Sequence, residues 1–193
     1  MKVEEKALVI DYMARGRSSD FKTEPLAQLI GTEFFTLLEV VPKSNVELKV
    51  LEEVYVGKGD RDKIEFIKKR ISFKNLTNTS LSDVENAIEA IIKNNEPKFV
   101  SFFNDSRSIT LKRHQIELLP GMGKKHMLQL IKEREKEPFK SFEDIKTRVH
   151  SVPDPIRAMV KRIMEELEGQ DIKYYLFVRP PSQEKEFHQR RRY

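Results

Sequence analysis

The sequence predicts an α+β protein: a small β-barrel domain in residues 1–105, an all-α domain in residues 106–169, and a C-terminal strand and basic tail in residues 170–193. Three observations lead to this fold class. Short apolar, β-branched runs separated by turn residues dominate the N-terminal part, as in strands. From Ser80 onward, apolar residues recur at spacings of three and four, as in helices. A chain of 193 residues that is 38% hydrophobic can bury two modest cores.

Composition excludes several kinds of site. The chain contains no cysteine and no tryptophan, so it forms neither disulfides nor thiolate metal sites, and it has no cysteine nucleophile. Lysine and glutamate interrupt the apolar run near the N-terminus, a pattern that suits neither a signal peptide nor a membrane span. We therefore expect a cytoplasmic protein with no membrane partner.

The positive charge is distributed unevenly. Residues 1–105 carry 16 Lys/Arg and 18 Asp/Glu, residues 106–170 carry 14 and 10, and residues 171–193 carry 6 and 3. The net charge of +5 therefore arises in the second half of the chain. Such a basic region favours a polyanionic partner, although an excess of this size is also ordinary for a solvated surface.

Four apolar segments are expected to form strands. They cover residues 7–14, 26–30, 34–41 and 54–56. A turn at Gly31 joins the second strand to the third. The basic segment that follows, residues 64–73, is ambiguous, because its isoleucines recur at three and four residues as on a helix, whereas its end alternates as in a strand.

Several short strands with one interrupting helix suit a small closed or partly open barrel, and we predict an OB-type barrel. Any other small α+β domain remains the alternative. Aromatic residues on the strands could give the barrel a base-stacking surface, but strand aromatics more often fill the core. The six residues concerned are Tyr12, Phe34, Phe35, Tyr55, Phe66 and Phe73.

Two helices are expected between the barrel and the second domain. The first covers residues 81–94, because Ser80 and Asp83 match a capping box and an apolar stripe follows them. That stripe consists of Val84, Ala87, Ile88, Ile91 and Ile92. The second is a short amphipathic segment that begins at Pro97 and contains three phenylalanines on one face.

A helix-turn-helix unit is predicted next. Thr110 is expected to cap a helix through Leu118, and a turn at residues 119–123 leads into a second helix, residues 124–136. In the first helix we expect Leu111, Ile116 and Leu119 to be buried and Lys112, Arg113 and His114 to lie near the surface.

The turn Leu119-Pro120-Gly121-Met122-Gly123 has the features of a phosphate-binding hairpin. Its two glycines allow a tight, partly left-handed backbone. Amides at the start of the following helix lack an intrahelical partner and lie at the positive end of the helix dipole, so a phosphate oxygen is their natural acceptor. The predicted nucleic-acid-binding residues are Gly121, Met122, Gly123, Lys124, Lys125, Lys112 and Arg113.

A second helix pair repeats this pattern. Ser141 is expected to cap one helix, and the turn at residues 152–156 lies 33 residues after the first turn, which suggests a duplication. Asp154 places a carboxylate where a phosphate would approach, and Pro155 removes an amide donor. The second turn is therefore predicted to bind no phosphate and to support the first.

The hairpin, followed by Pro138-Phe139-Lys140-Ser141-Phe142-Glu143-Asp144-Ile145, resembles the tandem helix-hairpin-helix domain of competence DNA receptors and Holliday-junction branch-migration proteins, over residues 108–168. The whole chain, with Pro25-Leu26-Ala27-Gln28-Leu29-Ile30-Gly31-Thr32 near its start, resembles an archaeal family of unknown function. That family is described as an OB-type barrel joined to such a domain and is expected to bind nucleic acid, with RNA favoured.

The helix-hairpin-helix resemblance implies that the hairpin amides bind one backbone phosphate, often with a monovalent cation and with basic side chains after the second glycine, here Lys124 and Lys125. The family commonly has a small residue where this chain has Met127, a departure that affects how closely the helices cross. Some base-excision glycosylases of the family carry a nucleophilic lysine at the position of Lys125. They pair it with a loop aspartate, whereas Glu143 and Asp144 are expected in the first turn of a helix.

The barrel and the C-terminus also offer a candidate second basic surface. Its residues are Lys58, Lys68, Lys69, Arg70, Arg190, Arg191 and Arg192. Acidic residues are interspersed with the first four, so a solvated charged face is the simpler interpretation. The four histidines have no spacing that suggests a metal site, and no cofactor is expected.

The sequence thus predicts a noncatalytic nucleic-acid-binding protein in which the hairpin holds a phosphate and the barrel contacts a neighbouring segment. RNA is slightly favoured over DNA through the family resemblance. One alternative is a protein-interaction module of a translation or transcription complex, such as the ribosome or polymerase, and a DNA-repair glycosylase/lyase is the less favoured one. Oligomeric state and sequence specificity remain open.

Overall fold

The computed structural model describes residues 3–16 and 24–180 of the 193-residue chain. These residues form a mixed α+β structure, with a curled five-stranded antiparallel sheet shaped as a half-barrel, a two-stranded ribbon and five α-helices. The strands are β1 (Lys6–Met13), β2 (Leu26–Gly31), β3 (Leu37–Pro42), β4 (Glu53–Tyr55), β5 (Ile64–Arg70), β6 (Ser108–Thr110) and β7 (Arg113–His114). The helices are α1 (Asn78–Asn94), α2 (Glu96–Asp105), α3 (Lys124–Lys136), α4 (Phe142–Arg148) and α5 (Pro155–Glu168), with 3₁₀ helices η1 (Phe73–Asn75) and η2 (Gln115–Leu118).

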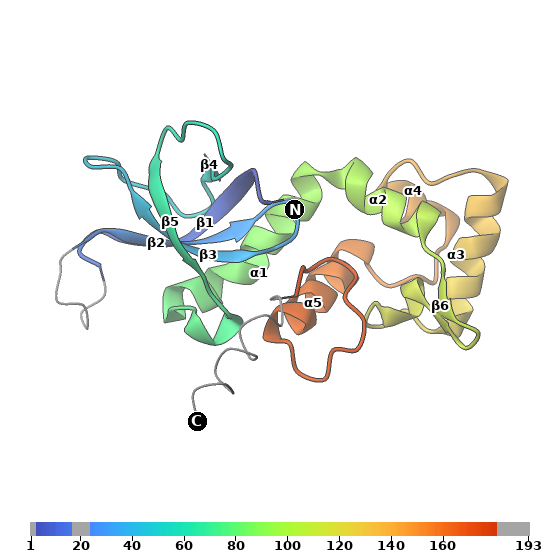
Figure 1. Ribbon diagram of the computed structural model, residues 1–193. Helices are drawn as coiled ribbons and strands as arrows, with labels where there is room; N and C mark the ends of the chain where they lie inside the picture. The colour runs from blue at the N-terminus through green and yellow to red at the C-terminus, as the bar shows by residue number, and fades with distance from the viewer. Residues whose placement is uncertain (1–2, 17–23, 181–193) are drawn as a thin grey trace, which may run out of the picture.

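The elements are arranged along one direction. In Figure 1 the half-barrel lies at one end of the molecule, α3 lies at the other, and α1 and α5 lie between them. The ribbon β6–β7 lies beside α3. No helix within the described ranges is long and apolar enough to span a membrane.

The main sheet has the strand order β4-β1-β2-β3-β5 and is antiparallel throughout. Irregularities in the β1–β2 and β3–β5 ladders curl it, because bulges increase local twist. β4 and β5 form the two edges, so in the described chain the barrel stays open between them. The ambiguous basic segment is therefore a strand, and its pairing with β3 decides this.

Both faces of the sheet are buried along its central strands β1, β2 and β3, which explains why these strands are almost continuously apolar. The inner face encloses its own hydrophobic cluster, to which Val9, Leu29 and Val40 contribute. The outer face is covered by α1, whose apolar stripe packs against Leu8 and Ile30. The predicted stripe of that helix is confirmed residue by residue: Val84, Ala87, Ile88, Ile91 and Ile92 are all buried.

The start of α1 differs from the prediction. Thr77, not Ser80, is the N-cap, and its hydroxyl oxygen accepts a hydrogen bond from the Ser80 amide at 3.1 Å. Ser80 is fully buried and donates to the side-chain oxygen of Gln28 at 2.7 Å. Gln28 in turn donates to the carbonyl of Asn75 at 2.9 Å. Ser80 therefore satisfies the buried side chain of Gln28 on β2, and Thr77 caps the helix in its place.

The helix predicted between Thr110 and Leu118 is wrong. Residues 108–114 form the ribbon β6–β7, and only a 3₁₀ turn, η2, precedes the hairpin. Leu111, which was expected to be buried, lies at the ribbon's turn with a relative exposure of 107%, whereas His114, expected at the surface, is buried. Ile116 and Leu119 are buried as predicted.

The C-terminal half is packed onto the rest by a continuous core. One hydrophobic cluster extends from the outer face of the sheet through α1 and α2 to α3, α4, α5 and Val178. The strand predicted in residues 172–178 does not form, and the segment is instead held by Glu166, whose carboxylate accepts the amides of Leu176, Phe177 and Val178. The domain boundary near residue 105 stays a prediction.

Candidate nucleic-acid interface

Residues 119–123 form a tight turn between η2 and α3. The amide of Met122 donates to the carbonyl of Leu119 at 2.9 Å, and Gly121 adopts a left-handed φ of 82°. The side chain of Met122 is 2% exposed, so it anchors the turn in the core. Met122 was predicted to bind nucleic acid, but only its backbone is placed to reach a ligand.

The start of α3 has free amides. Gly123 is the N-cap residue and supplies no side-chain acceptor. Within the described residues, the amides of Gly123, Lys124 and Lys125 have no hydrogen-bond acceptor. They lie at the positive end of the helix dipole, where an anion is the favoured acceptor.

The other helices of the described chain begin differently. Side chains of Thr77, Ser141 and Asp154 cap α1, α4 and α5, and Glu96 places a carboxylate in the first turn of α2. In this part of the chain, α3 alone begins with neither a side-chain cap nor an acidic residue in its first turn. Its start is therefore the one best suited to an external anion.

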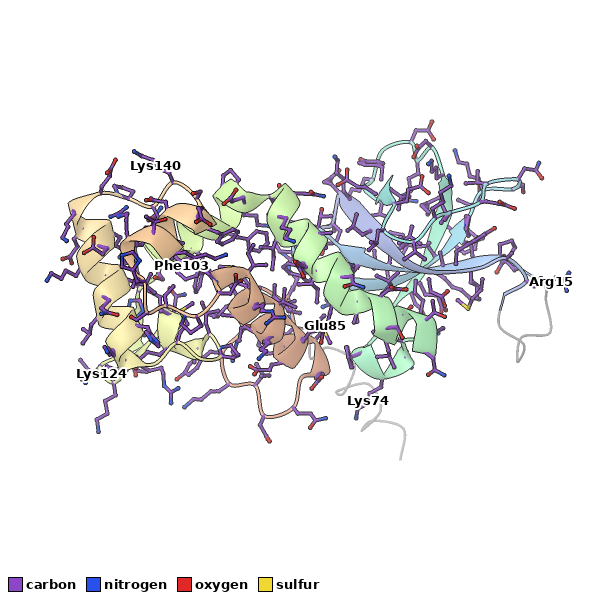
Figure 2. All side chains as sticks on the ribbon, turned by 180° about the vertical axis from the view of Figure 1, so that it is seen from behind. Arg15, Lys74, Glu85, Phe103, Lys124 and Lys140 are labelled. Atoms are coloured by element: carbon purple, nitrogen blue, oxygen red, sulfur yellow. The ribbon has the colours of Figure 1, made fainter. Side chains whose placement is uncertain are left out.

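A hollow of about 550 Å³ lies between the ribbon and α3. Lys112, Arg113 and Lys124 line it, so the structure brings together three of the four basic residues predicted for the site. Lys125 is exposed on α3 outside this hollow. Figure 2 shows the side chain of Lys124 projecting away from the body of the molecule.

These four basic residues form no ion pair with any described residue. Other lysines of the same region do: Lys136, Lys140 and Lys146 pair with Glu133, Glu137 and Asp154 at 2.5, 2.7 and 2.8 Å. Ion pairs with the described chain therefore do not offset the positive charge of the hairpin.

Two exposed apolar side chains at this hollow were not predicted. Leu111 is fully exposed at the ribbon's turn, and Leu128 on α3 is 55% exposed. The helical spacing of the sequence had predicted that Leu111 is buried, and its exposure follows only from its position at the turn of the ribbon. The hollow is therefore basic at its rim and apolar in part of its wall.

At the second turn, protein groups already occupy the start of the following helix, α5. The carboxylate of Asp154 accepts the amide of Arg157 at 2.9 Å and the ammonium of Lys146 at 2.8 Å, and Pro155 begins α5. Burial raises the pKa of Asp154, but the hydrogen bonds from Lys146 and Arg157 outweigh it and hold the pKa below its ordinary value. A Cβ built on Gly121 would lie 3.4 Å from Pro153, so the two turns pack against each other.

The predicted second basic surface is divided. Lys68 and Lys69 point to carboxylates, with Glu24 at 3.9 Å and Glu39 at 3.4 Å. Lys58 and Arg70 line one pocket at the half-barrel together with Arg61, which belongs to the same basic run of the sequence, and Arg179, which the sequence did not single out. Arg190, Arg191 and Arg192 lie outside the described residues.

The aromatic residues of the half-barrel form no common stacking surface in the described structure. Phe35 is 1% exposed in the core, whereas Phe66 is 43% exposed on the edge strand β5. Phe34 lies under the guanidinium of Arg179, whose carbon is 3.9 Å from the ring centroid. The outer faces of β2 and β3 are covered by the chain itself, and this closes the surface that a stacking platform would need.

No group of three or more His, Asp or Glu side chains among the described residues is placed to hold a metal ion. The carboxylate of Asp144 is engaged, because it accepts the amide of Lys140 at 3.0 Å and the guanidinium of Arg148 at 3.2 Å.

Comparison with known proteins places the chain in a family. Residues 3–179 match the family described as "Protein of unknown function (DUF655)". An uncharacterized protein of Methanocaldococcus jannaschii is 41% identical over 179 residues, which cover 92% of this chain and 81% of that protein. A crystal structure from Archaeoglobus fulgidus, assigned to the same family, matches with a TM-score of 0.85 and 44% identity over 91% of this chain and all of that one. The predicted resemblance to an archaeal family of unknown function is thus confirmed, and the chain belongs to the DUF655 family.

Proposed function

We propose that this protein binds nucleic acid without catalysing a reaction on it, and that residues 119–123 with the start of α3 hold one backbone phosphate. The observation that carries the proposal is the uncapped, exposed start of α3, where the amides find no hydrogen-bond acceptor among the described residues. Helix starts of this kind are ready-made sites for phosphate oxygens.

The surrounding charge supports the same ligand. Lys112, Arg113, Lys124 and Lys125 carry no ion pair with the described chain, and three of them border one hollow. Basic residues that converge on a phosphate-binding turn release counterions from a nucleic acid and so favour a polyanion over a single anion. Such contacts position the strand without reading its sequence. The preference for RNA over DNA rests on the resemblance to the archaeal family.

The arrangement of the helices supports a pair of helix-hairpin-helix units. η2, the turn and α3 form the first, and α4, its turn and α5 form the second, with the two turns in contact through Gly121 and Pro153. The first arm of the first unit is only a four-residue 3₁₀ helix, which departs from the pattern. The second unit, whose helix start is capped, serves to hold the first in place.

The strand order supports an OB-type barrel, because β1 joins β2 to β4 while β3 joins β2 to β5. OB barrels bind oligonucleotides on the face of their second and third strands. In this chain every residue of β2 and β3 is buried, so we assign the barrel's contact with a neighbouring segment to its open end rather than to the face of the sheet.

The noncatalytic assignment has a structural basis as well. Lyases of the helix-hairpin-helix type pair their lysine with a loop aspartate, whereas Asp144 lies in the first turn of α4 and accepts the Lys140 amide and the Arg148 guanidinium. Lys125 itself is exposed at the start of α3, where a lysine serves as a phosphate contact.

A salt titration tests the phosphate site. Lys124→Glu with Lys125→Glu should weaken binding to single-stranded RNA and to duplex DNA, because each lost phosphate contact removes about 0.7 from the slope of log K against log salt on single strands and about 0.9 on B-DNA. Fluorescence anisotropy between low and physiological salt measures both quantities. A shallower slope in the double variant supports the site, and an unchanged affinity and slope would refute it.

The control carries the same charge change elsewhere. Lys49 and Lys74 are exposed and form no ion pair with a described residue, and Figure 2 shows Lys74 well apart from Lys124. Lys49→Glu with Lys74→Glu lowers the net charge equally, so it corrects for nonspecific attraction. The hairpin proposal requires the first double variant to lose more affinity than this one.

One observation favours a second candidate, a protein-docking module of a translation or transcription complex. Leu111 and Leu128 expose apolar surface at the hollow, and exposed apolar groups beside basic ones are common where proteins meet. In that case the lysine double variant would bind nucleic acid as the wild type does, so the same titration separates the two candidates.

A further inference from the structure

A second pocket lies at the end of the half-barrel where β3 begins and β5 ends. Its volume is about 320 Å³, at the lower end of the range for small-ligand sites. Side chains of Leu38, Val56 and Ile67 give it an apolar floor. Figure 1 places this end of the sheet far from α3, so the pocket is separate from the hairpin.

Four cationic side chains surround that floor: Lys58, Arg61, Arg70 and Arg179. Three of them are held in position by the chain. Arg61 donates its Nε–H to the carbonyl of Gly57 at 2.9 Å, and the guanidinium of Arg70 donates to the carbonyl of Arg179. The guanidinium of Arg179 lies over the ring of Phe34, a cation–π contact. The positive groups are therefore pre-organised and would lose little entropy on binding an anion.

The pocket has an excess of positive charge. Glu4 is the one carboxylate among the described residues that line it. Its oxygens accept the amides of Glu33, Phe34 and Thr36 at 2.9 to 3.1 Å, so backbone donors already occupy it. Burial, followed by the like charge of Arg179, lowers the pKa of Arg70 from its ordinary value, and Glu4 opposes this only in part. A bound anion would relieve the repulsion between the two arginines.

The combination of an apolar floor and a cationic rim selects the ligand class. Inorganic phosphate would make no use of the apolar floor, and an uncharged base would make no use of the cationic rim. A nucleoside phosphate satisfies both, because its base can pack on the apolar side chains while arginine forks bind its phosphate oxygens. We infer that this pocket binds a nucleoside monophosphate, either as a free nucleotide or as the phosphorylated terminal nucleotide of a strand.

Calorimetric titration with AMP, GMP, CMP and UMP at low ionic strength tests the inference. At least one nucleotide should bind about tenfold or more tightly than its nucleoside and than inorganic phosphate, because only the nucleotide uses floor and rim together. Arg70→Gln should weaken that binding about tenfold. Lys58→Gln should weaken nucleotide binding as well. Lys58 is exposed and forms no hydrogen bond with the described chain, so its substitution should not disturb the end of β5 as the loss of Arg70 could.

Lys68→Gln is the matched control, because Lys68 lies on the same strand and changes charge equally but does not line the pocket. It should leave nucleotide binding unchanged. Absence of nucleotide binding at millimolar concentration would overturn the inference. So would equal binding of nucleotide and inorganic phosphate that neither Arg70→Gln nor Lys58→Gln affects.

Oligonucleotides distinguish the two sources of the ligand and separate this site from the hairpin. In a Gly123→Asp background, which blocks the hairpin, a 5′-phosphorylated oligonucleotide that binds more tightly than both its 5′-hydroxyl form and the free nucleotide identifies a strand end. Equal binding of the free nucleotide identifies a mononucleotide. Either result supports the pocket, and either can occur whether or not the hairpin proposal holds.

Discussion

Gly121 and Gly123 serve different physical purposes although they are two positions apart. Gly121 has a φ of 82°, in the left-handed region that residues with a Cβ rarely adopt, and a Cβ there would be in ordinary contact with Pro153 at 3.4 Å. Gly123 has an ordinary φ of −78°, and a Cβ built on it meets nothing within 4 Å. A side chain is therefore permitted at Gly123, and what the glycine provides is an uncapped helix start.

Gly123→Asp tests this role, because it gives the first hairpin the kind of cap that Asp154 gives the second. Aspartate is a good N-cap residue and should stabilise the protein by a few tenths of a kcal/mol relative to glycine. Its carboxylate would also occupy the amides and repel phosphate, so affinity for nucleic acid should fall by about tenfold or more. Thermal denaturation and anisotropy measure the two effects.

Gly123→Ala is the control for that variant. It adds a Cβ in open space but no acceptor, so the amides stay free and nucleic-acid binding should persist. Alanine is a poorer cap than glycine, and a stability loss of up to about 1 kcal/mol is expected. Wild-type affinity in a folded Gly123→Asp protein would contradict the assignment of the amides to phosphate.

The element before the hairpin shows how tertiary contacts override local periodicity. Apolar spacing in residues 110–119 predicts a helix, but a helix of that length is marginal on its own. In the structure, the Gln115 amide donates to the carbonyl of Arg107 at 3.0 Å, and the Gln115 side chain accepts the Arg107 amide at 2.7 Å. Arg134 donates to the carbonyl of Ser106 at 2.8 Å and fixes the same segment from α3. None of these contacts is visible in the spacing of apolar residues.

The two candidate sites differ in how far the sequence predicts them. The glycines and lysines of the hairpin are neighbours in the chain, so their geometry follows from one turn and one helix start. The half-barrel pocket joins Glu4, Lys58, Arg70 and Arg179, which only the curled sheet and the returning C-terminal segment bring together. The sequence predicted the bounds of β1 to β4 within a few residues. It left β5 ambiguous between helix and strand, and only the pairing with β3 identifies it as a strand.

The 3₁₀ helix η2 should make the protein sensitive to acid through its cap residue. His114 Nδ1 accepts the amide of Ile116 at 3.2 Å. Burial, then the positive charge of Arg134, lower its pKa, and Glu117 and a hydrogen bond that the ring donates to the backbone carbonyl of Ser106 oppose this in part. Protons therefore bind the unfolded state more readily, so the stabilisation is complete above the ordinary histidine pKa of 6.5 and declines as the pH falls below it.

Urea denaturation between pH 7.5 and 5.5 tests this dependence. The free energy of unfolding should fall with acidification more steeply in the wild type than in His114→Asn, whose amide oxygen can still accept the Ile116 amide but does not titrate. One titrating group contributes a slope of at most about 1.4 kcal/mol per pH unit, which bounds the difference. Identical slopes would show that His114 does not carry the effect.

At the scale of the whole molecule, α1 and the C-terminal segment join the two ends. α1 covers the outer face of the sheet with one side and packs against α5 with another, as Figure 1 shows. The C-terminal segment crosses from Glu166 to the half-barrel, where the Arg179 amide donates to the carbonyl of Phe34 at 3.2 Å. The position of one pocket arginine therefore depends on a carboxylate in α5.

Glu166→Gln tests this coupling. The Glu166 side chain is fully buried, pairs with Arg162 at 2.9 Å and accepts three backbone amides, so replacing one carboxylate oxygen with an NH₂ group should cost about 3–5 kcal/mol of unfolding free energy. Glu165→Gln is the matched control. Its side chain is 48% exposed and 3.5 Å from the same arginine, so its loss should cost at most about 1 kcal/mol. Equal costs by urea denaturation would show that Glu166 does not anchor the C-terminal segment.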